Sequence, residues 1–79
     1  MNNDQRPFAA ETIYYGYRPT DIGLAAIAIS RRGVTAVLLG TDRHDLRRKL
    51  VDALSGADLV ENDLSIAATL DAVARYVGH

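Results

Sequence analysis

The spacing of hydrophobic positions changes near residue 40, from a period of two to a period near 3.6. The first half of the chain contains short runs of apolar, aromatic and β-branched residues, at 12–18, 24–30 and 34–39. Such runs predict β-strands. Both faces of the second run are apolar, which is typical of a central strand that is covered on both sides. Turn-forming residues separate the runs, so we expect a three-stranded antiparallel meander.

After residue 40 the helical period predicts two helices. The first has an apolar stripe made of Leu46, Leu50, Val51 and Leu54. Thr41 or Asp42 can cap its start, and Gly56 can close its end. The predicted fold class is therefore α+β, with a three-stranded antiparallel meander followed by two helices.

The second helix is expected from about residue 63 to residue 76. Its stripe is Leu64 or Ile66, with Leu70, Val73 and Val77. Asn62 or Asp63 is the expected cap. We interpret residues 58–63, between the helices, as a polar link that contains two apolar residues. Residues 1–11 are interpreted as a flexible leader, and residues 12–79 as a single domain.

Composition narrows the class of protein. A chain of 79 residues that is 48% hydrophobic and 24% charged fits one small globular domain. Its formal net charge of −1 lacks the basic excess of a generic nucleic-acid binder. No apolar run approaches the roughly 18 residues of a membrane span. The absence of cysteine removes disulfides, thiolate metal ligands and cysteine nucleophiles, and it is consistent with a cytoplasmic protein.

The charged cluster at residues 41–45 has two interpretations. Asp42, His44 and Asp45 could act as acid–base groups or metal ligands, which would make the chain a small enzyme. Carboxylates in a first helical turn also accept free backbone N–H groups and complement the helix dipole. We favour the cap, with His44 facing solvent opposite the leucines.

Two further groups of residues could bind nucleic acid. The weak candidates for phosphate contact are Arg31, Arg32, Arg47 and Arg48, although nearby aspartates offset their charge. Tyr14, Tyr15 and Tyr17 could stack on bases, but adjacent tyrosines on opposite faces of a strand cannot form one platform. We therefore favour packing for the tyrosines. No DNA-binding residue, catalytic residue, metal ligand or cofactor is assigned.

Several short motifs resemble one known family in their order and spacing. An aromatic strand starts the unit, and a turn ending in Ile22-Gly23 leads to a small-apolar strand. Residues 30–34, SRRGV, resemble the family's "SERG[IV]" hairpin, and residues 36–40, AVLLG, resemble its "AILLG" before an acidic helix start. Over residues 11–77 the chain thus resembles the N-terminal subdomain of the O6-alkylguanine-DNA alkyltransferases, the methylated-DNA–protein-cysteine methyltransferases, most closely the Ada type.

The resemblance implies a ribonuclease-H-like lobe without catalytic residues. In that family the methyl acceptor is a cysteine in a Pro-Cys-His-Arg motif of the following domain, which also carries the DNA-binding helix-turn-helix. The expected partners are therefore that catalytic domain and, through it, damaged DNA, with no membrane. Some members bind zinc in this lobe through cysteine and histidine, but this chain has no cysteine, so no zinc is expected.

A scaffolding lobe needs an exposed apolar surface for its partner domain. We expect both helices to cover one face of the sheet and the other face to stay open. The expected open surface consists of Leu24, Ala26, Ala28 and the tyrosines. The alternative function is a small stand-alone interaction or regulatory module without repair chemistry.

Overall fold

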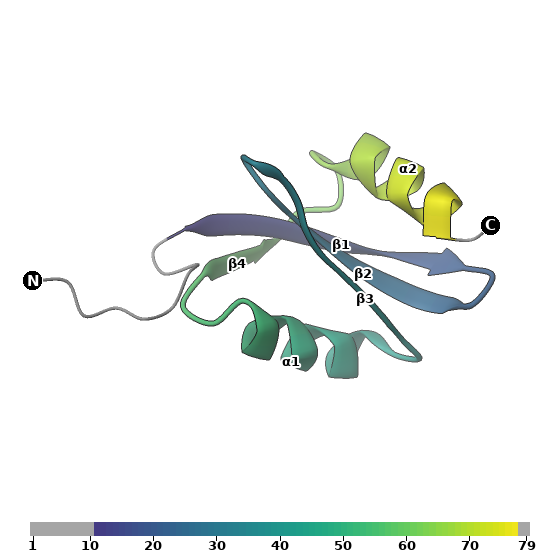
Figure 1. Ribbon diagram of the computed structural model, residues 1–79, viewed down its shortest axis with the longest axis horizontal. Coiled ribbons are helices and arrows are strands. Elements are labelled where there is room, and N and C mark those ends of the chain that lie inside the picture. Colours follow the sequence, from purple (N-terminus) through teal and green to yellow (C-terminus); the bar gives the residue numbers. More distant parts are fainter. Residues whose placement is uncertain (1–10, 78–79) are drawn as a thin grey trace, which may run out of the picture.

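The computed structural model describes residues 11–77, which form a sheet with one helix on each of its faces (Figure 1). The elements, in chain order, are β1 (Thr12–Thr20), β2 (Gly23–Ser30), β3 (Gly33–Gly40), α1 (Arg43–Ala53), β4 (Asp58–Glu61) and α2 (Ala67–Val77). The α+β class and the antiparallel meander are confirmed. The strands extend the predicted ones by one or two residues at their ends.

The strand order in the sheet is β3-β2-β1-β4. Strands β1, β2 and β3 pair antiparallel through two tight turns. Gly23 and Gly33, which follow the two turns, have φ values of 138° and 121°, a region that glycine adopts without steric penalty. The strands of the meander therefore reverse direction where the sequence places a glycine directly after a polar turn.

Strand β4 was not predicted. It pairs with β1 in parallel, with Thr12 opposite Asp58 and Ile13 opposite Leu59. The segment interpreted as a polar link is thus partly a strand, and the two apolar residues in it are its half-buried centre. Strand β4 is only four residues long and is charged at both ends. Its formation therefore depends on pairing with β1 rather than on a hydrophobic pattern of its own.

Helix α1 begins as predicted. The Asp42 side chain accepts a hydrogen bond of 2.9 Å from the backbone N–H of Asp45, which makes Asp42 the N-cap. Gly56, in the turn after the helix, has a φ of 90°. Helix α2 begins at Ala67, four residues later than expected, because the preceding segment forms turns instead. Asn62 caps one of these turns by accepting a hydrogen bond of 3.2 Å from the N–H of Ser65.

The two helices lie on opposite faces of the sheet, contrary to expectation (Figure 1). Helix α1 covers the face that carries the larger cluster, made of Ile13, Tyr15, Tyr17, Ala26, Ala28, Leu46, Leu50 and Leu54. Helix α2 covers part of the other face through Ala25, Ile27 and Leu70. Because the chain passes along the outer edge of β1 as β4 before α2 starts, it can continue onto the second face.

Candidate interaction surface

The surface expected to be open is buried. Ala26 and Ala28 are fully inaccessible to solvent, and Tyr15 and Tyr17 are almost so. Leu24 packs at the margin of the same cluster. This expectation was wrong because it placed both helices on one face, whereas α1 alone covers these residues. Of the three tyrosines only Tyr14, on the other face, is substantially exposed.

Tyr15 and Tyr17 hold α1 against the sheet through their rings and hydroxyl groups. The two rings meet edge to face, with centroids 5.9 Å apart. The Arg47 Nε donates a hydrogen bond of 2.9 Å to the Tyr15 hydroxyl. The guanidinium of Arg43 lies 4.9 Å from the centre of the Tyr17 ring, which is a cation–π contact. The predicted packing role of these two tyrosines is confirmed.

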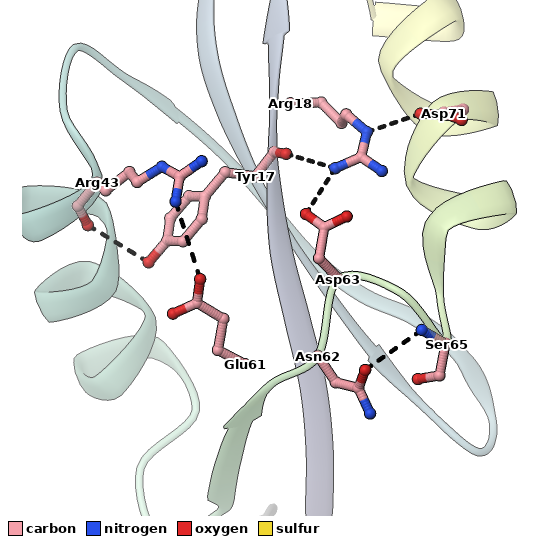
Figure 2. Close-up of polar contacts among 8 residues, drawn as sticks. All are labelled: Tyr17, Arg18, Arg43, Glu61, Asn62, Asp63, Ser65 and Asp71. Atoms are coloured by element: carbon pink, nitrogen blue, oxygen red, sulfur yellow. Dashed lines mark hydrogen bonds and ion pairs between the residues drawn. The ribbon is translucent and has the colours of Figure 1, made fainter.

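Burial raises the pKa of the Tyr17 hydroxyl above its ordinary value of 10.0, with Tyr15 and Glu61 adding to the effect. Its hydroxyl points to the backbone oxygen of Arg43, 3.5 Å away, and Glu61 lies near the Arg43 guanidinium (Figure 2). A raised folded-state pKa favours the neutral phenol, so the stability it contributes is lost only as the pH rises above about 10. Tyr17 is therefore a neutral packing residue at physiological pH.

On the opposite face, Arg18 joins β1 to the start and the body of the α2 region (Figure 2). Its Nη1 donates to the Asp63 carboxylate at 2.7 Å and to the backbone oxygen of Tyr17 at 2.8 Å. Its Nε donates to Asp71 of α2 at 2.6 Å. One guanidinium thus fixes both the connection after β4 and the first turns of the helix.

These contacts shift the pKa of both partners. The hydrogen bonds that Arg18 donates to Asp63 and Asp71 raise the pKa of Arg18, and the bond that Asp63 accepts lowers the pKa of Asp63 below its ordinary 3.8. Because its pKa is lowered in the folded state, the Asp63 carboxylate stabilises the fold above pH 3.8. This contribution is lost as the pH falls through the folded-state pKa. The Arg18 network is thus a structural clamp that acid weakens.

Gly16 lets α2 approach β1 closely. A Cβ atom at this position would lie 2.6 Å from Cδ1 of Leu70, which is the fully buried residue of α2. Gly16 therefore leaves room for the Leu70 side chain on this face, a role that could not be predicted from the strand pattern alone.

Helix α2 leaves part of its face of the sheet open. Its buried contacts are with Ala25 and Ile27 of β2 and with β1. Beyond them, three apolar side chains of β3 are exposed by between 37% and 49%, namely Val34, Val37 and Leu39, which we call the open strip. The register places Val37 opposite Ile27 and Leu39 opposite Ala25, which puts the strip on the α2 side. The open strip is the candidate interaction surface.

The charged cluster at the start of α1 is organised as a helix terminus. Asp45 pairs with Arg48 and, at 3.2 Å, with Lys49 of the same helix, and these contacts lower its pKa. His44 is exposed, as predicted. Asp42 is the cap rather than a partner for the imidazole. Among residues 11–77, no group of three or more His, Cys, Asp or Glu side chains is placed to hold a metal ion.

The four arginines named as weak DNA-binding candidates lie in two separate places. Arg31 and Arg32 form the β2–β3 turn, whereas Arg47 and Arg48 lie on α1, away from that turn (Figure 1). Three of them have partners: Arg32 pairs with Glu11 at 3.3 Å, Arg47 with Tyr15, and Arg48 with Asp45. The structure therefore does not gather them into one basic patch, and their contact with DNA stays a prediction.

The β2–β3 turn borders a hollow of about 630 Å³ that is open to solvent. Its wall is lined by Glu11, Thr12, Tyr14, Ile29, Ser30, Arg31 and Arg32. The Ser30 hydroxyl there accepts a hydrogen bond of 3.1 Å from the N–H of Arg32, so it shapes the turn. Ser30, the last residue of β2, thus helps to fix the turn that follows it.

Neither helix in the part of the chain described by the structure is long and apolar enough to cross a membrane.

The residues that sequence reasoning missed are those of the open strip and the Arg18 clamp. The register of β3 with β2 places Val37 and Leu39 on one face, and only the placement of α2 shows that this face stays open. In comparisons with known proteins, the chain matches no family model and no curated protein.

Proposed function

We propose that the chain is the non-catalytic N-terminal lobe of an Ada-like, methylated-DNA–protein-cysteine methyltransferase and that it supports a catalytic domain. The observation that carries the proposal is the ordered set of motifs in residues 12–45. Each motif coincides with an element of the fold: the aromatic strand is β1, SRRGV is the β2–β3 hairpin, AVLLG ends β3, and the acidic start caps α1.

The chemistry of alkyl transfer supports a scaffolding role rather than a catalytic one. Direct transfer of an alkyl group from guanine O6 to a protein requires a strong nucleophile, which in the resembled family is a cysteine thiolate. These 79 residues contain no cysteine. The cytoplasm is the compartment that we propose for the parent protein, and DNA would be contacted through the catalytic domain.

The open strip is the surface that we assign to the catalytic domain. Val34, Val37 and Leu39 give a row of exposed apolar side chains on β3, on the same face of the sheet as the helix clamped by Arg18. Apolar side chains grouped in this way are typical of surfaces that another protein covers. A docked domain would remove the strip from water without changing the sheet.

The proposal is tested by titrating the isotope-labelled chain with a catalytic domain that carries the Pro-Cys-His-Arg motif, and by following methyl resonances. We expect the Val34, Val37 and Leu39 methyl groups to shift, while those of Leu46 and Leu50 in the core remain. Binding that leaves the open strip unchanged would contradict the assigned surface.

A second measurement tests the chemistry. With O6-methylguanine DNA that carries a labelled methyl group, the chain alone should take up no label. Stoichiometric labelling of the chain would refute the scaffolding role. The natural reading frame after His79 offers a further check, because the proposal requires a Pro-Cys-His-Arg segment in the parent protein.

The alternative function is a stand-alone interaction or regulatory module. The exposure of the open strip favours it equally, because an apolar surface does not identify its partner. A stable complex with a protein unrelated to DNA repair, lost when Val37 and Leu39 are made polar, would favour this alternative.

A further inference from the structure

The two outer strands of the sheet differ in how well they are protected against pairing. Within residues 11–77, β4 and β3 are the edges of the sheet. Strand β4 has four residues, and exposed carboxylates stand at both its ends, Asp58 and Glu61. Strand β3 has eight residues, GVTAVLLG, with no charged residue and no proline. Short length and charge are devices that prevent edge pairing, and β3 has neither.

One irregularity limits which part of β3 can accept a partner. The ladder between β2 and β3 shifts between Ala28 and Ile29, so that Thr35 is left outside the pairing as a bulge. From Ala36 to Gly40 the pairing with β2 is regular. A further strand would therefore add most readily along residues 36–40, whose centre is Leu38.

We propose that two copies of the chain pair through their β3 strands, antiparallel and centred on Leu38, to form one continuous sheet with four strands from each copy. The two-fold axis stands perpendicular to the sheet, so both α1 helices lie on one side and both α2 helices on the other. Val37 of each copy then lies opposite Leu39 of the other on the α2 side, which brings exposed apolar side chains into contact.

The charges at the two ends of β3 complement each other in this arrangement. Arg31 and Arg32 precede the strand, and Asp42 follows it. Antiparallel pairing centred on Leu38 sets Asp42 of one copy opposite Val34 of the other, at the same end of the paired strands as the arginine turn. Arg31 has no ion pair among the described residues, and the exposed Arg32 has only Glu11, at 3.3 Å. Parallel pairing would instead bring like charges together, so the charge pattern selects the antiparallel two-fold.

The proposal does not rest on the proposed function: it shares Val37 and Leu39 with the open strip, but it depends on main-chain pairing along the edge of β3 and requires no catalytic domain. A chain that stays monomeric would leave the scaffolding role untouched. Conversely, a chain that dimerises through β3 but never binds a catalytic domain would overturn only the scaffolding role.

The experiment is sedimentation analysis of the chain over a wide concentration range, expecting a concentration-dependent species of twice the monomer mass of 8.6 kDa. The double variant Val37→Lys/Leu39→Lys sets two pairs of lysines opposite each other across the axis. It should raise the concentration of half-dimerisation by about tenfold or more. The matched control is Leu64→Lys/Tyr76→Lys, which adds the same charge at exposed apolar residues outside β3 and should leave dimerisation unchanged.

Cross-linking provides a test that does not depend on the lysine variants folding. Because the chain has no cysteine, single Val37→Cys and Leu39→Cys chains carry one thiol each. An oxidised equimolar mixture should yield mixed dimers, whereas either variant alone should yield few, since diagonal neighbours about 7–8 Å apart are too distant for a disulfide. A monomer at every concentration overturns the proposal. So does a dimer that neither the lysine pair nor the mixed thiols affect.

Discussion

The two faces of the sheet are covered to very different extents. On the α1 face, two leucines of α1 and Leu54 at its C-cap pack against tyrosines and alanines of β1 and β2, and the cluster extends to β3 and β4. On the α2 face, Leu70 is the only fully buried residue of its helix, and β3 remains open. Both helices have 11 residues, so the difference lies in how much apolar surface each one buries. We infer that the α1 face supplies most of the stability, whereas the α2 face leaves the open strip exposed.

The largest effect is expected from Leu50→Ala, on the α1 face. Leu50 is fully buried in the larger cluster, so truncating its side chain removes buried apolar contacts and leaves a cavity. We expect a loss of about 3–4 kcal/mol in the free energy of unfolding, which is a large fraction of the stability of so small a domain. Urea denaturation followed by circular dichroism measures it. A loss below about 1 kcal/mol would contradict the assigned importance of this face.

Leu70→Ala is the matched change on the α2 face. Leu70 is equally inaccessible, but its cluster is small and lies next to solvent, so neighbouring groups can move into the space. We expect a loss of about 2 kcal/mol. Amide hydrogen exchange should show protection lost in α2 while β2 and α1 keep theirs. Equal loss of protection in α1 would mean that the two faces do not differ as described.

Two glycines allow a finer comparison of the faces. A Cβ at Gly16 would meet Leu70 at 2.6 Å, and one at Gly40 would meet Leu46 at 3.0 Å. Gly16→Ala should therefore destabilise the fold by about 1–2 kcal/mol and Gly40→Ala by less. Thermal denaturation of the two variants measures the difference. The reverse order would show that α2 adjusts more easily than α1.

The smallest expected effect comes from the Arg18 clamp. Arg18→Met keeps the side-chain stem and removes the hydrogen bonds to Asp63 and Asp71. Since these groups are partly exposed, we expect a loss of about 1 kcal/mol at neutral pH. The lowered pKa of Asp63 adds a signature. Above about pH 4 the free energy of unfolding of the wild type should exceed that of the variant, and the difference should decrease as the pH falls further. A gap that does not depend on pH would contradict the ionic role of the clamp.

The meander could be predicted because its signals are local. The strands follow from runs of apolar, aromatic and β-branched residues at 12–18 and 34–39, and the turns from glycines after polar residues. Asp42 likewise lies only three residues before the N–H that it caps. The same holds for the packing of Tyr15 and Tyr17 and for the exposure of His44, since both follow from the face that each residue occupies.

The remaining features depend on contacts between distant residues. Strand β4 is defined by pairing with β1, about 46 residues earlier in the chain, as between Thr12 and Asp58. The face of the sheet on which α2 packs follows from the path of the chain around that edge. The apolar stripe of α2 could cover either face, so it does not predict which one. Ala26 and Ala28 were consequently assigned to an open surface, and the open strip on β3 was not recognised.

The parallel pairing of β4 with β1 has a consequence for synthesis on the ribosome. The meander consists of neighbouring segments and can form as soon as residue 40 has emerged, but the outer edge of β1 lacks a partner until residue 61 follows. During that interval the nascent chain presents a second bare edge, beside the aromatic residues of its first strand. Pairing of the four residues of β4 with β1, rather than formation of the hairpins, is therefore the step that removes this second bare edge from the growing chain.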